Sequence, residues 1–378
     1  MRTRWQPGQL LFVGFAGTSP PRKLLELVRA GRVGGVILFT RNIPTRTEIG
    51  PDKQPVTVPD PAALRGLVAT LRDAAPADAP LAVAIDQEGG RVQRLRAPWT
   101  EWPPMRRLGE LNMPEWTADV ATALARELVD VGITLDFAPV VDVDSNPANP
   151  VIGDRSFARS ASDVATHAAA FVRALQAGGV AACAKHFPGH GDTREDSHFA
   201  LPKLPHDLDR LFEVELPPFV AAIEAGVATL MTAHVIFEAI DRKRPATFSP
   251  DVMALLRERL GYDRLVFSDD LEMKAVVDSM PPRKMPAAAL EAGIDALLVC
   301  SELDFAEEVL DGLEHCRDHL LEHPLARMAA LKESFPGLPA SAAARDGDER
   351  DAPEPQAPAG PPYAEHVALS ERLRRGAE

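Results

Sequence analysis

Residues 180–198 read VAACAKHFPGHGDTREDSH and contain the pattern that decides the fold. The stretch opens with the apolar run Val180–Ala184, and the polar residues Lys185 and His186 follow where that run ends. A continuous apolar run, unlike an alternating one, is typical of a strand that is covered on both faces in a parallel sheet. We therefore predict a buried strand here, with its polar successors at the carboxyl end.

Seven similar runs occur along the chain. They are Leu10–Ala16, Val33–Phe39, Leu81–Ile85, Ile133–Val141, Ala228–Ala233, Leu265–Ser268 and Ala296–Cys300. Segments with helical spacing, such as Ala62–Ala74 and Ala161–Ala177, lie between the runs. Eight buried strands that alternate with helices predict an α/β fold, a single (β/α)8 TIM barrel. An open doubly wound sheet is the alternative, because periodicity alone does not establish closure.

Polar residues gather at the carboxyl ends of the predicted strands. They are Asp86, Asp142, Lys185, His186, His234 and Asp269. In a closed barrel these ends meet at one rim, where barrel enzymes hold their catalytic residues. Aspartate after a strand is also common as a helix cap, but the Lys and His among these residues favour a functional site. We therefore expect an active site at this rim.

Composition excludes several classes of protein. The chain has 378 residues, with 41 Lys and Arg against 55 Asp and Glu, and a formal charge of −14. Affinity that depends on phosphate neutralisation does not suit so acidic a protein, so we expect no nucleic-acid partner. No run approaches the roughly 18 apolar residues of a membrane helix, so we expect no membrane partner. Three cysteines make no disulfide framework, and we predict a cytoplasmic monomer.

Composition also divides the chain into three parts. We assign residues 1–336 to the barrel, and Pro44–Pro61 within it to an extended, proline-rich insertion after the second strand. Residues 337–362 are rich in Ala, Pro and acidic residues, which predicts a disordered linker in the C-terminal tail. Residues 363–378 are predicted to form a short C-terminal helix, and the sequence leaves open whether it docks on the barrel.

The histidine-rich stretch 185–198 admits two chemical interpretations. In the first, His186, His190 and His198 bind a metal ion, since imidazole suits zinc and similar ions. In the second, one histidine transfers protons, because its ordinary pKa lies near neutrality. The pair Asp196 and His198 supports the second interpretation, since a nearby carboxylate can fix the tautomer of the ring and raise its basicity.

Two further strand ends carry carboxylates. In IDQEGGRVQRL, residues 85–95, Asp86 can accept hydrogen bonds from neighbouring hydroxyl groups and Arg94 can hold a polar group. Glu88 is interpreted there as a turn residue or one that supports the site from behind. In LVFSDDLEM, residues 265–273, Asp269 or Asp270 is a candidate nucleophile or ligand. Successive residues of a strand face opposite sides, so we expect only one of the two in the site.

Five motifs together resemble the β-N-acetylhexosaminidases of glycoside hydrolase family 3, in the branch that recycles peptidoglycan. The motifs are IDQEGGRVQRL, VIGDRSF, KHFPGHGDTREDSH, MTAHVIF and FSDDLEM, in that order, and the resemblance covers roughly residues 8–320. It implies a single-domain (β/α)8 barrel that removes terminal, non-reducing β-linked N-acetylglucosamine with retention of configuration.

The resemblance also implies roles for individual residues. Asp269 matches the nucleophile, His198 matches the general acid and base, and Asp196 matches the carboxylate partner of His198. The positions that match the family's sugar-binding residues are Asp86, Arg94, Arg155, Lys185 and His186. A retaining glycosidase usually pairs two carboxylates about 5 Å apart, so an imidazole acid is a departure that protonated histidine can still perform. The resemblance implies no metal or other cofactor.

The expected function is therefore a retaining exo-β-N-acetylglucosaminidase that acts on muropeptide-derived sugars, a small carbohydrate substrate. Three alternatives stay open. A phosphorylase would use the same site with phosphate in place of water, because a neutral imidazole repels an incoming anion less than a carboxylate does. A metal-dependent hydrolase would use His186, His190 and His198. A sugar-binding sensor would keep the fold without catalysis.

Overall fold

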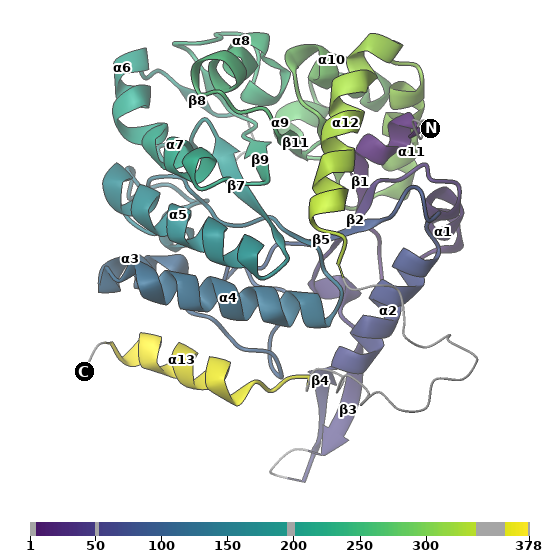
Figure 1. The fold of residues 1–378 in the computed structure, drawn as a ribbon. Coiled ribbons are helices and arrows are strands. Elements are labelled where there is room, and N and C mark those ends of the chain that lie inside the picture. The colour runs from purple at the N-terminus through teal and green to yellow at the C-terminus, as the bar shows by residue number, and fades with distance from the viewer. Residues whose placement is uncertain (1–4, 50–52, 195–200, 338–359, 377–378) are drawn as a thin grey trace.

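The computed structural model describes residues 5–49, 53–194, 201–337 and 360–376 (Figure 1). Eight parallel strands form a closed barrel, in the order β1-β12-β11-β9-β7-β6-β5-β2. Their bounds are β1 (Leu11–Val13), β2 (Gly35–Leu38), β5 (Ala82–Ile85), β6 (Leu135–Asp136), β7 (Ala181–Phe187), β9 (Thr229–Thr232), β11 (Leu265–Asp270) and β12 (Ala296–Val299). Six of the eight predicted runs contain a whole strand, whereas β7 and β11 begin within their runs and extend past them to Phe187 and Asp270. Closure confirms the TIM barrel over the open sheet.

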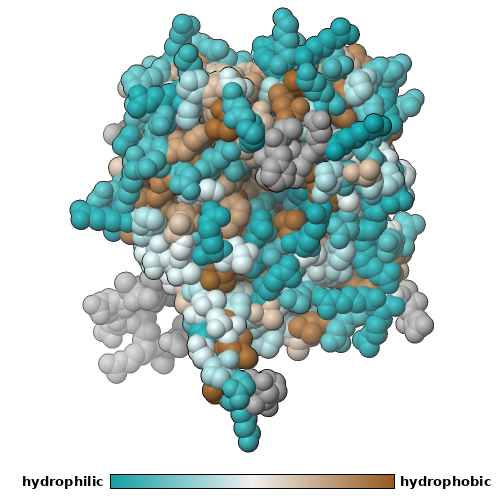
Figure 2. All heavy atoms as spheres, turned by 180° about the vertical axis from the view of Figure 1, so that it is seen from behind, coloured by the Kyte–Doolittle hydropathy of each residue, from teal (hydrophilic) through white to brown (hydrophobic). Residues whose placement is uncertain are grey.

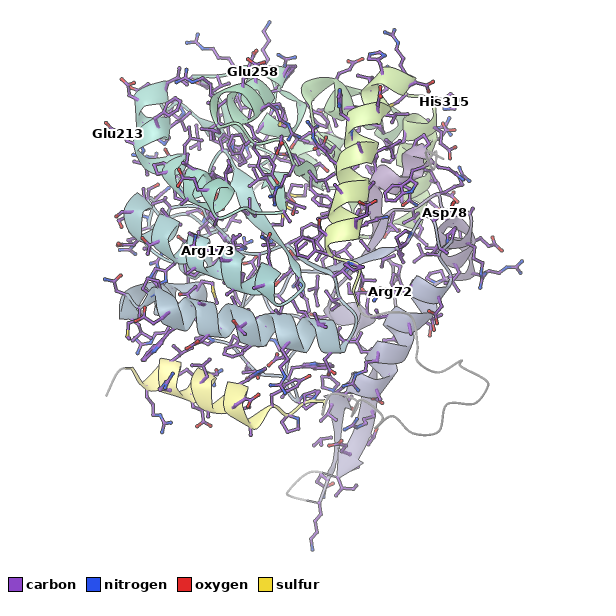
Figure 3. The ribbon with its side chains drawn as sticks, in the orientation of Figure 1. Arg72, Asp78, Arg173, Glu213, Glu258 and His315 are labelled. Carbon is purple, nitrogen blue, oxygen red and sulfur yellow. The ribbon has the colours of Figure 1, made fainter. Side chains whose placement is uncertain are left out.

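Helices surround the barrel. The longer ones are α1 (Arg22–Arg29), α2 (Pro61–Asp73), α4 (Pro114–Asp130), α5 (Ala161–Ala177), α7 (Pro217–Glu224), α10 (Met285–Ala292), α11 (Leu303–Glu314) and α12 (Asp318–Ser334). Two of them begin at a capping residue: the Asp60 carboxylate accepts two N–H groups at the start of α2, and the Ser160 hydroxyl accepts one at the start of α5. Exposed charged side chains such as Arg173 and Glu258 lie on this outer layer (Figure 3).

Aromatic side chains fill the inside of the barrel. The Phe267 ring meets Phe12 and Phe137 edge to face, with centroids 4.9 Å and 5.2 Å away. All three are fully buried. Gly35 on the neighbouring strand has no room for a side chain, because a Cβ there would lie 2.2 Å from the Phe12 ring. The interior is therefore a packed core, and ligand space is confined to the ends of the strands.

The proline-rich insertion forms an antiparallel hairpin. Strands β3 (Thr45–Ile49) and β4 (Pro55–Pro59) pair along their whole length and project away from the barrel near the start of α2 (Figure 1). Ile49 at the end of β3 is 71% exposed. In the view from behind, the hairpin stands clear of a surface on which hydrophilic residues predominate (Figure 2). The extended conformation of this insertion was predicted. Its folding into two paired strands was not, because amino-acid composition does not show which residues pair.

The C-terminal helix packs against the barrel. It is α13 (Ala364–Arg375), which lies along α4 (Figure 1). Leu373 is fully buried and Tyr363, just before the helix, is 4% exposed. Residues 338–359 of the predicted linker lie outside the described residues. In the described part of the chain, the helices lack the length and apolar composition needed to cross a membrane.

Candidate active site

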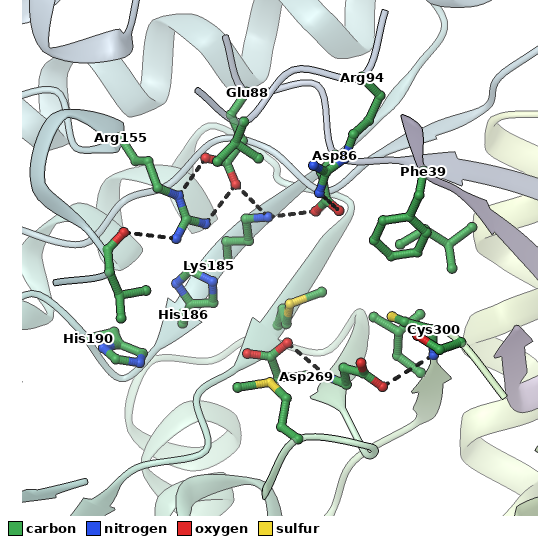
Figure 4. Close-up of a pocket in the computed structure, with 18 residues that line it drawn as sticks. Phe39, Asp86, Glu88, Arg94, Arg155, Lys185, His186, His190, Asp269 and Cys300 are labelled. Carbon is green, nitrogen blue, oxygen red and sulfur yellow. Dashed lines mark hydrogen bonds and ion pairs between the residues drawn. The ribbon is translucent and has the colours of Figure 1, made fainter. Parts of the chain in front are cut away.

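A cavity of about 280 Å3 opens where the barrel strands end (Figure 4). Six of the eight predicted site residues line it: Asp86, Arg94, Arg155, Lys185, His186 and Asp269. The other two, Asp196 and His198, lie outside the described residues. Small-molecule pockets in proteins start at about 300 Å3, so the cavity suits a single small ligand unit.

Lys185, near the end of β7, joins two carboxylates on one side of the cavity. Its Nζ lies 2.9 Å from Asp86 Oδ1 and 2.7 Å from Glu88 Oε1. Two arginines complete this group: Arg155 binds Glu88 through two hydrogen bonds of 2.8 Å, and Arg94 Nη2 lies 3.1 Å from Asp86 Oδ2. We call these five residues the charged cluster. Its members come from the loops that follow β5 and β6 and from the end of β7.

The charged cluster keeps both of its carboxylates ionised. Burial works to raise the pKa of Glu88, but the facing Arg155 and Lys185 outweigh burial and hold that pKa far below its ordinary value. Lys185 and Arg94 likewise lower the pKa of Asp86 against the effect of burial. In turn, Asp86 and Glu88 raise the pKa of Lys185 although burial opposes its charge. The cavity therefore offers fixed charges of both signs to a polar ligand.

Glu88 is more closely involved than the sequence predicted. Its backbone does start a turn, because the Glu88 N–H donates to Val92 O. However, its side chain lines the cavity and is 2% exposed. The turn was predicted, whereas its place in the cavity wall was not. That place depends on Lys185 and Arg155, which follow other strands and which a single stretch of sequence does not connect to Glu88.

Asp142 orients His186. His186 Nδ1 lies 2.7 Å from Asp142 Oδ2, so this nitrogen carries a proton and Nε2 is left for other partners. Asp142 Oδ1 also accepts the His190 N–H at 2.6 Å. Burial opposes ionisation of Asp142, but His186 lowers its pKa below the ordinary value. One buried carboxylate therefore fixes the ring of His186 and the loop that follows β7.

The residues after His190 are held by asparagine and histidine side chains. Asn149 Nδ2 donates to His190 O at 2.8 Å, and the Thr193 hydroxyl lies 2.8 Å from His190 Nδ1. Asp192 is 2.6 Å from the Nε2 of His206. Burial lowers the pKa of His190 to about 4, which favours its neutral form. Within the described ranges, no three His, Cys, Asp or Glu side chains are grouped as a metal site requires.

Asp269, near the end of β11, faces the cavity opposite the charged cluster (Figure 4). Its Oδ1 accepts the N–H of Asp270 at 2.8 Å. Burial works to raise the pKa of Asp269, but His234 and His186, together with that N–H, bring it below its ordinary value. Asp269 is therefore ionised at neutral pH, as a nucleophile or a stabilising charge must be.

Asp270 corrects another expectation, because it lines the same cavity as Asp269. The pairing of β11 with β12 is irregular between Phe267 and Asp270, so strict alternation of side chains does not apply there. Asp270 Oδ1 accepts two backbone N–H groups, and burial together with Glu272 raises its pKa to about 7. The pKa values of the two neighbouring carboxyls are thus shifted in opposite directions although both line the site.

His234 is held by two partners and supports this side of the cavity. Its Nε2 lies 2.9 Å from the carbonyl oxygen of Asp270, which only accepts hydrogen bonds, so Nε2 carries a proton. Its Nδ1 lies 2.8 Å from the Thr247 hydroxyl. The ring is fully buried. It therefore serves the site by its hydrogen bonds and its closeness to Asp269.

Comparison with known proteins identifies the family. The profile of the glycosyl hydrolase family 3 N-terminal domain matches residues 3–331. The chain belongs to this family. A curated beta-hexosaminidase of Bordetella parapertussis is 37% identical over 342 residues, which cover 87% of this chain and 88% of the relative. The resemblance read from the five motifs is thus confirmed, and this family 3 member is a glycoside hydrolase.

Solved structures agree with the assignment. A family 3 beta-N-acetylglucosaminidase from Paenibacillus sp. str. FPU-7 is 36% identical, with a TM-score of 0.86 over 99% of this chain and 68% of that chain. NagZ from Neisseria gonorrhoeae, solved in complex with N-trifluoroacetyl-D-glucosamine, is 32% identical, with a TM-score of 0.73 over 84% of this chain and 89% of that one.

The apolar part of this family 3 cavity was not predicted. Met231, Met273 and Phe39 line it beside Cys300. The Phe39 ring lies between two guanidinium groups, with Arg41 Cζ 4.3 Å and Arg94 Cζ 5.2 Å from its centroid. Apolar residues at strand ends look the same in sequence as those of the core, so only the fold separates them.

Proposed function

We propose that this family 3 member is a retaining exo-β-N-acetylglucosaminidase that removes non-reducing terminal β-linked N-acetylglucosamine from muropeptide-derived sugars. Relatives named beta-hexosaminidase and beta-N-acetylglucosaminidase support the sugar, and the complex of a neighbour with an N-acylated glucosamine supports its position in such a barrel. The resemblance to the peptidoglycan-recycling branch supports the muropeptide substrate. We further propose that the protein is a cytoplasmic monomer.

In the proposed mechanism Asp269 attacks the anomeric carbon. The bond from that carbon to the leaving oxygen breaks while protonated His198 donates its proton to the same oxygen, and a glycosyl-enzyme forms on Asp269. Neutral His198 then removes a proton from water, the water oxygen bonds to the anomeric carbon, and Asp269 is released. Asp196 stabilises the charged ring of His198 before the first step and again after the second, when the ring carries a proton.

The charged cluster and His186 hold the sugar in the same proposal. Asp86 accepts hydrogen bonds from sugar hydroxyls, while Arg94, Arg155 and Lys185 donate to sugar oxygens. Because these side chains already bond to one another, little conformational entropy is lost when the sugar replaces water among them. Binding then contributes to orientation of the anomeric carbon over Asp269.

One observation carries the proposal: an ionised aspartate faces a dense set of fixed polar groups across a cavity of about 280 Å3. Two carboxylates of the cluster are neutralised by direct partners, whereas Asp269 accepts only a backbone N–H from the described residues. A carboxylate that is charged but not bound to a cation is suited to bond formation at carbon.

The first experiment measures turnover of a chromogenic β-N-acetylglucosaminide by the wild type, Asp269→Ala and His198→Ala. We expect detectable activity only in the wild type. After the wild type reacts with a slow fluorinated substrate, the peptide that contains Asp269 should gain the mass of one glycosyl unit. A fully active Asp269→Ala variant would reject the nucleophile. Product analysis with phosphate present separates hydrolysis from phosphorolysis, because only the latter yields a sugar 1-phosphate.

A further inference from the structure

The segment between β5 and α3 (Met105–Leu111), residues 86–104, supplies three members of the charged cluster. Two buried glutamines give it a fixed shape. Gln87 Oε1 accepts the Arg94 N–H at 2.8 Å, and Gln93 Oε1 accepts the Trp102 N–H at 3.0 Å. The Gly90 N–H donates to Trp102 O at 3.0 Å. A displacement at Trp102 is therefore passed to both ends of the loop that carries Glu88 and Arg94.

Helix α13 holds the far end of this segment. The Ser370 hydroxyl donates to Glu101 O at 2.6 Å, and Arg374 Nη2 donates to the same carbonyl oxygen. Ser370 is 2% exposed, so its bond is protected from water. The His366 ring lies 6.1 Å from Trp102, which is also 2% exposed. Three residues of one helix thus contact two consecutive residues of the segment.

A separate set of contacts fixes α13 itself on α4. The Tyr363 hydroxyl donates to Asp130 Oδ2 at 2.6 Å, and His366 Nδ1 lies 2.8 Å from Glu127 Oε1. Both carboxylates belong to α4 and are nearly or fully buried. The helix therefore has its own anchor, independent of Glu101, and can act as a fixed support for the segment.

Packing does not fill the space between the segment and α13. A second cavity of about 540 Å3 is lined by Gly90 and Trp102 on one side and by Arg374 and the α3 residue Arg107 on the other. Since few atoms meet across a cavity, the position of the segment there depends on individual hydrogen bonds. The two bonds to Glu101 O therefore add to the burial of Trp102 in holding the segment against α13.

We propose that α13 is a positioning element for sugar binding: Ser370 and Arg374 hold Glu101, and the cross-linked segment sets the positions of Arg94 and Glu88 in the cavity. The family profile ends at residue 331, so the family assignment gives α13 no role. The inference rests on the proposed function for its kinetic consequence, whereas its structural consequence is independent of any substrate.

The kinetic test compares the full-length double variant Ser370→Ala/Arg374→Ala with Arg375→Ala. Arg375 is the matched control, because it lies next to Arg374 on α13 but is exposed and pairs with Glu371 on its own helix. We expect the double variant to raise KM for the chromogenic β-N-acetylglucosaminide about fivefold, from two lost hydrogen bonds, and to change kcat less than about twofold. The control should match the wild type.

Further variants separate positioning from stability. Tyr363→Phe removes the bond to Asp130 on α4 and leaves the bonds to Glu101 in place. We expect this variant to lose about as much thermal stability as the double variant but to keep the wild-type KM. The single variant Ser370→Thr keeps both the hydroxyl group and Arg374. Its KM should therefore equal that of the wild type. An equal rise of KM in Tyr363→Phe, or unchanged KM in the double variant, would overturn the inference.

Hydrogen exchange supplies the readout that needs no substrate. In the double variant, amides of residues 88–102 should exchange about tenfold faster than in the wild type, while those of α5 remain unchanged. If the wild type does not turn over the substrate but the double variant still shows faster exchange, the proposed function is rejected and the positioning role is kept. Normal turnover with unchanged exchange and KM would reject the positioning role alone.

Discussion

The two sides of the active-site cavity use the same residue type in opposite ways. On the charged cluster, Asp86 and Glu88 bond directly to Lys185 and to arginines at 2.7–3.1 Å. On the β11 side, Asp269 accepts a backbone N–H from the described residues and lies near two histidine rings. All of these carboxylates have a lowered pKa, but among the residues that the structure describes only Asp269 reaches that state without a bonded cation.

The difference teaches how a site separates binding from reaction. A carboxylate bonded to a cation has its lone pairs directed and its charge compensated, so it suits hydrogen bonding to hydroxyl groups. A carboxylate kept ionised by more distant charges retains a reactive oxygen. Substitutions on the two sides should therefore change different quantities: kcat on the β11 side, and KM or stability on the side of the charged cluster.

The largest effect is expected for Asp269→Asn. The amide keeps the size of the carboxyl but cannot form the glycosyl-enzyme, so kcat should fall about 10⁴-fold. Asp270→Asn is the matched neighbour: its pKa near 7 and its two backbone bonds mean that an amide replaces it with less than about tenfold loss. Steady-state kinetics on a chromogenic substrate measure both. Equal losses would show that the two carboxyls are not functionally distinct.

The second effect concerns Lys185→Met, which removes the cation shared by Asp86 and Glu88. Two buried carboxylates then lose a partner, so the free energy of unfolding should fall by about 3–5 kcal/mol. KM should rise in whatever folded protein remains. Urea denaturation and kinetics measure the two changes, with Lys185→Arg as the variant that keeps the charge. Full stability in Lys185→Met would mean that Lys185 does not hold the charged cluster together.

A smaller, pH-dependent effect is expected for Glu88→Gln. Because the pKa of Glu88 is lower in the folded than in the unfolded protein, its contribution is present above the unfolded pKa, about 4.3, and is lost as the pH falls through the folded value. The variant should therefore be less stable than the wild type at pH 7 by about 2 kcal/mol, with a smaller difference near pH 3. A pH-independent difference in urea denaturation would contradict this.

The smallest effect is expected for Asp136→Asn, directly beneath the charged cluster. Burial raises the pKa of Asp136 to about 8, and its Oδ1 accepts the Gln87 N–H at 2.9 Å. A raised folded pKa means that stability is lost as the pH rises from about 4 to 8. Because the amide cannot ionise, the variant should become more stable relative to the wild type as the pH rises over this range. Parallel stability curves would show that Asp136 is ionised.

The strands of the barrel were predictable because each is short, continuous and apolar. Their burial on both faces leaves little choice of residue, and runs such as Val180–Ala184 therefore stand out from the amphipathic helices around them. The pairing of the Pro44–Pro61 insertion was not predictable. Its strands lie outside the core, so no apolar pattern records their register.

The site was predictable where a polar residue ends a strand and unpredictable where two distant segments combine. Asp86, Lys185 and Asp269 were found by position alone. Glu88 acquires its role from two distant partners, Arg155 and Lys185. Both Asp269 and Asp270 line the cavity, where the pairing of β11 is locally irregular. Partners and bulges of this kind depend on three-dimensional closure, which local sequence does not encode.

The position of Lys185 between two acidic partners has a consequence for protein engineering. Exchanging one member of this set leaves at least one buried charge without its partner, so a library that varies single positions will mostly return destabilised proteins. Attempts to alter sugar preference should vary residues 86, 88, 155 and 185 jointly, with total charge held constant, and leave the separate β11 carboxylate in place.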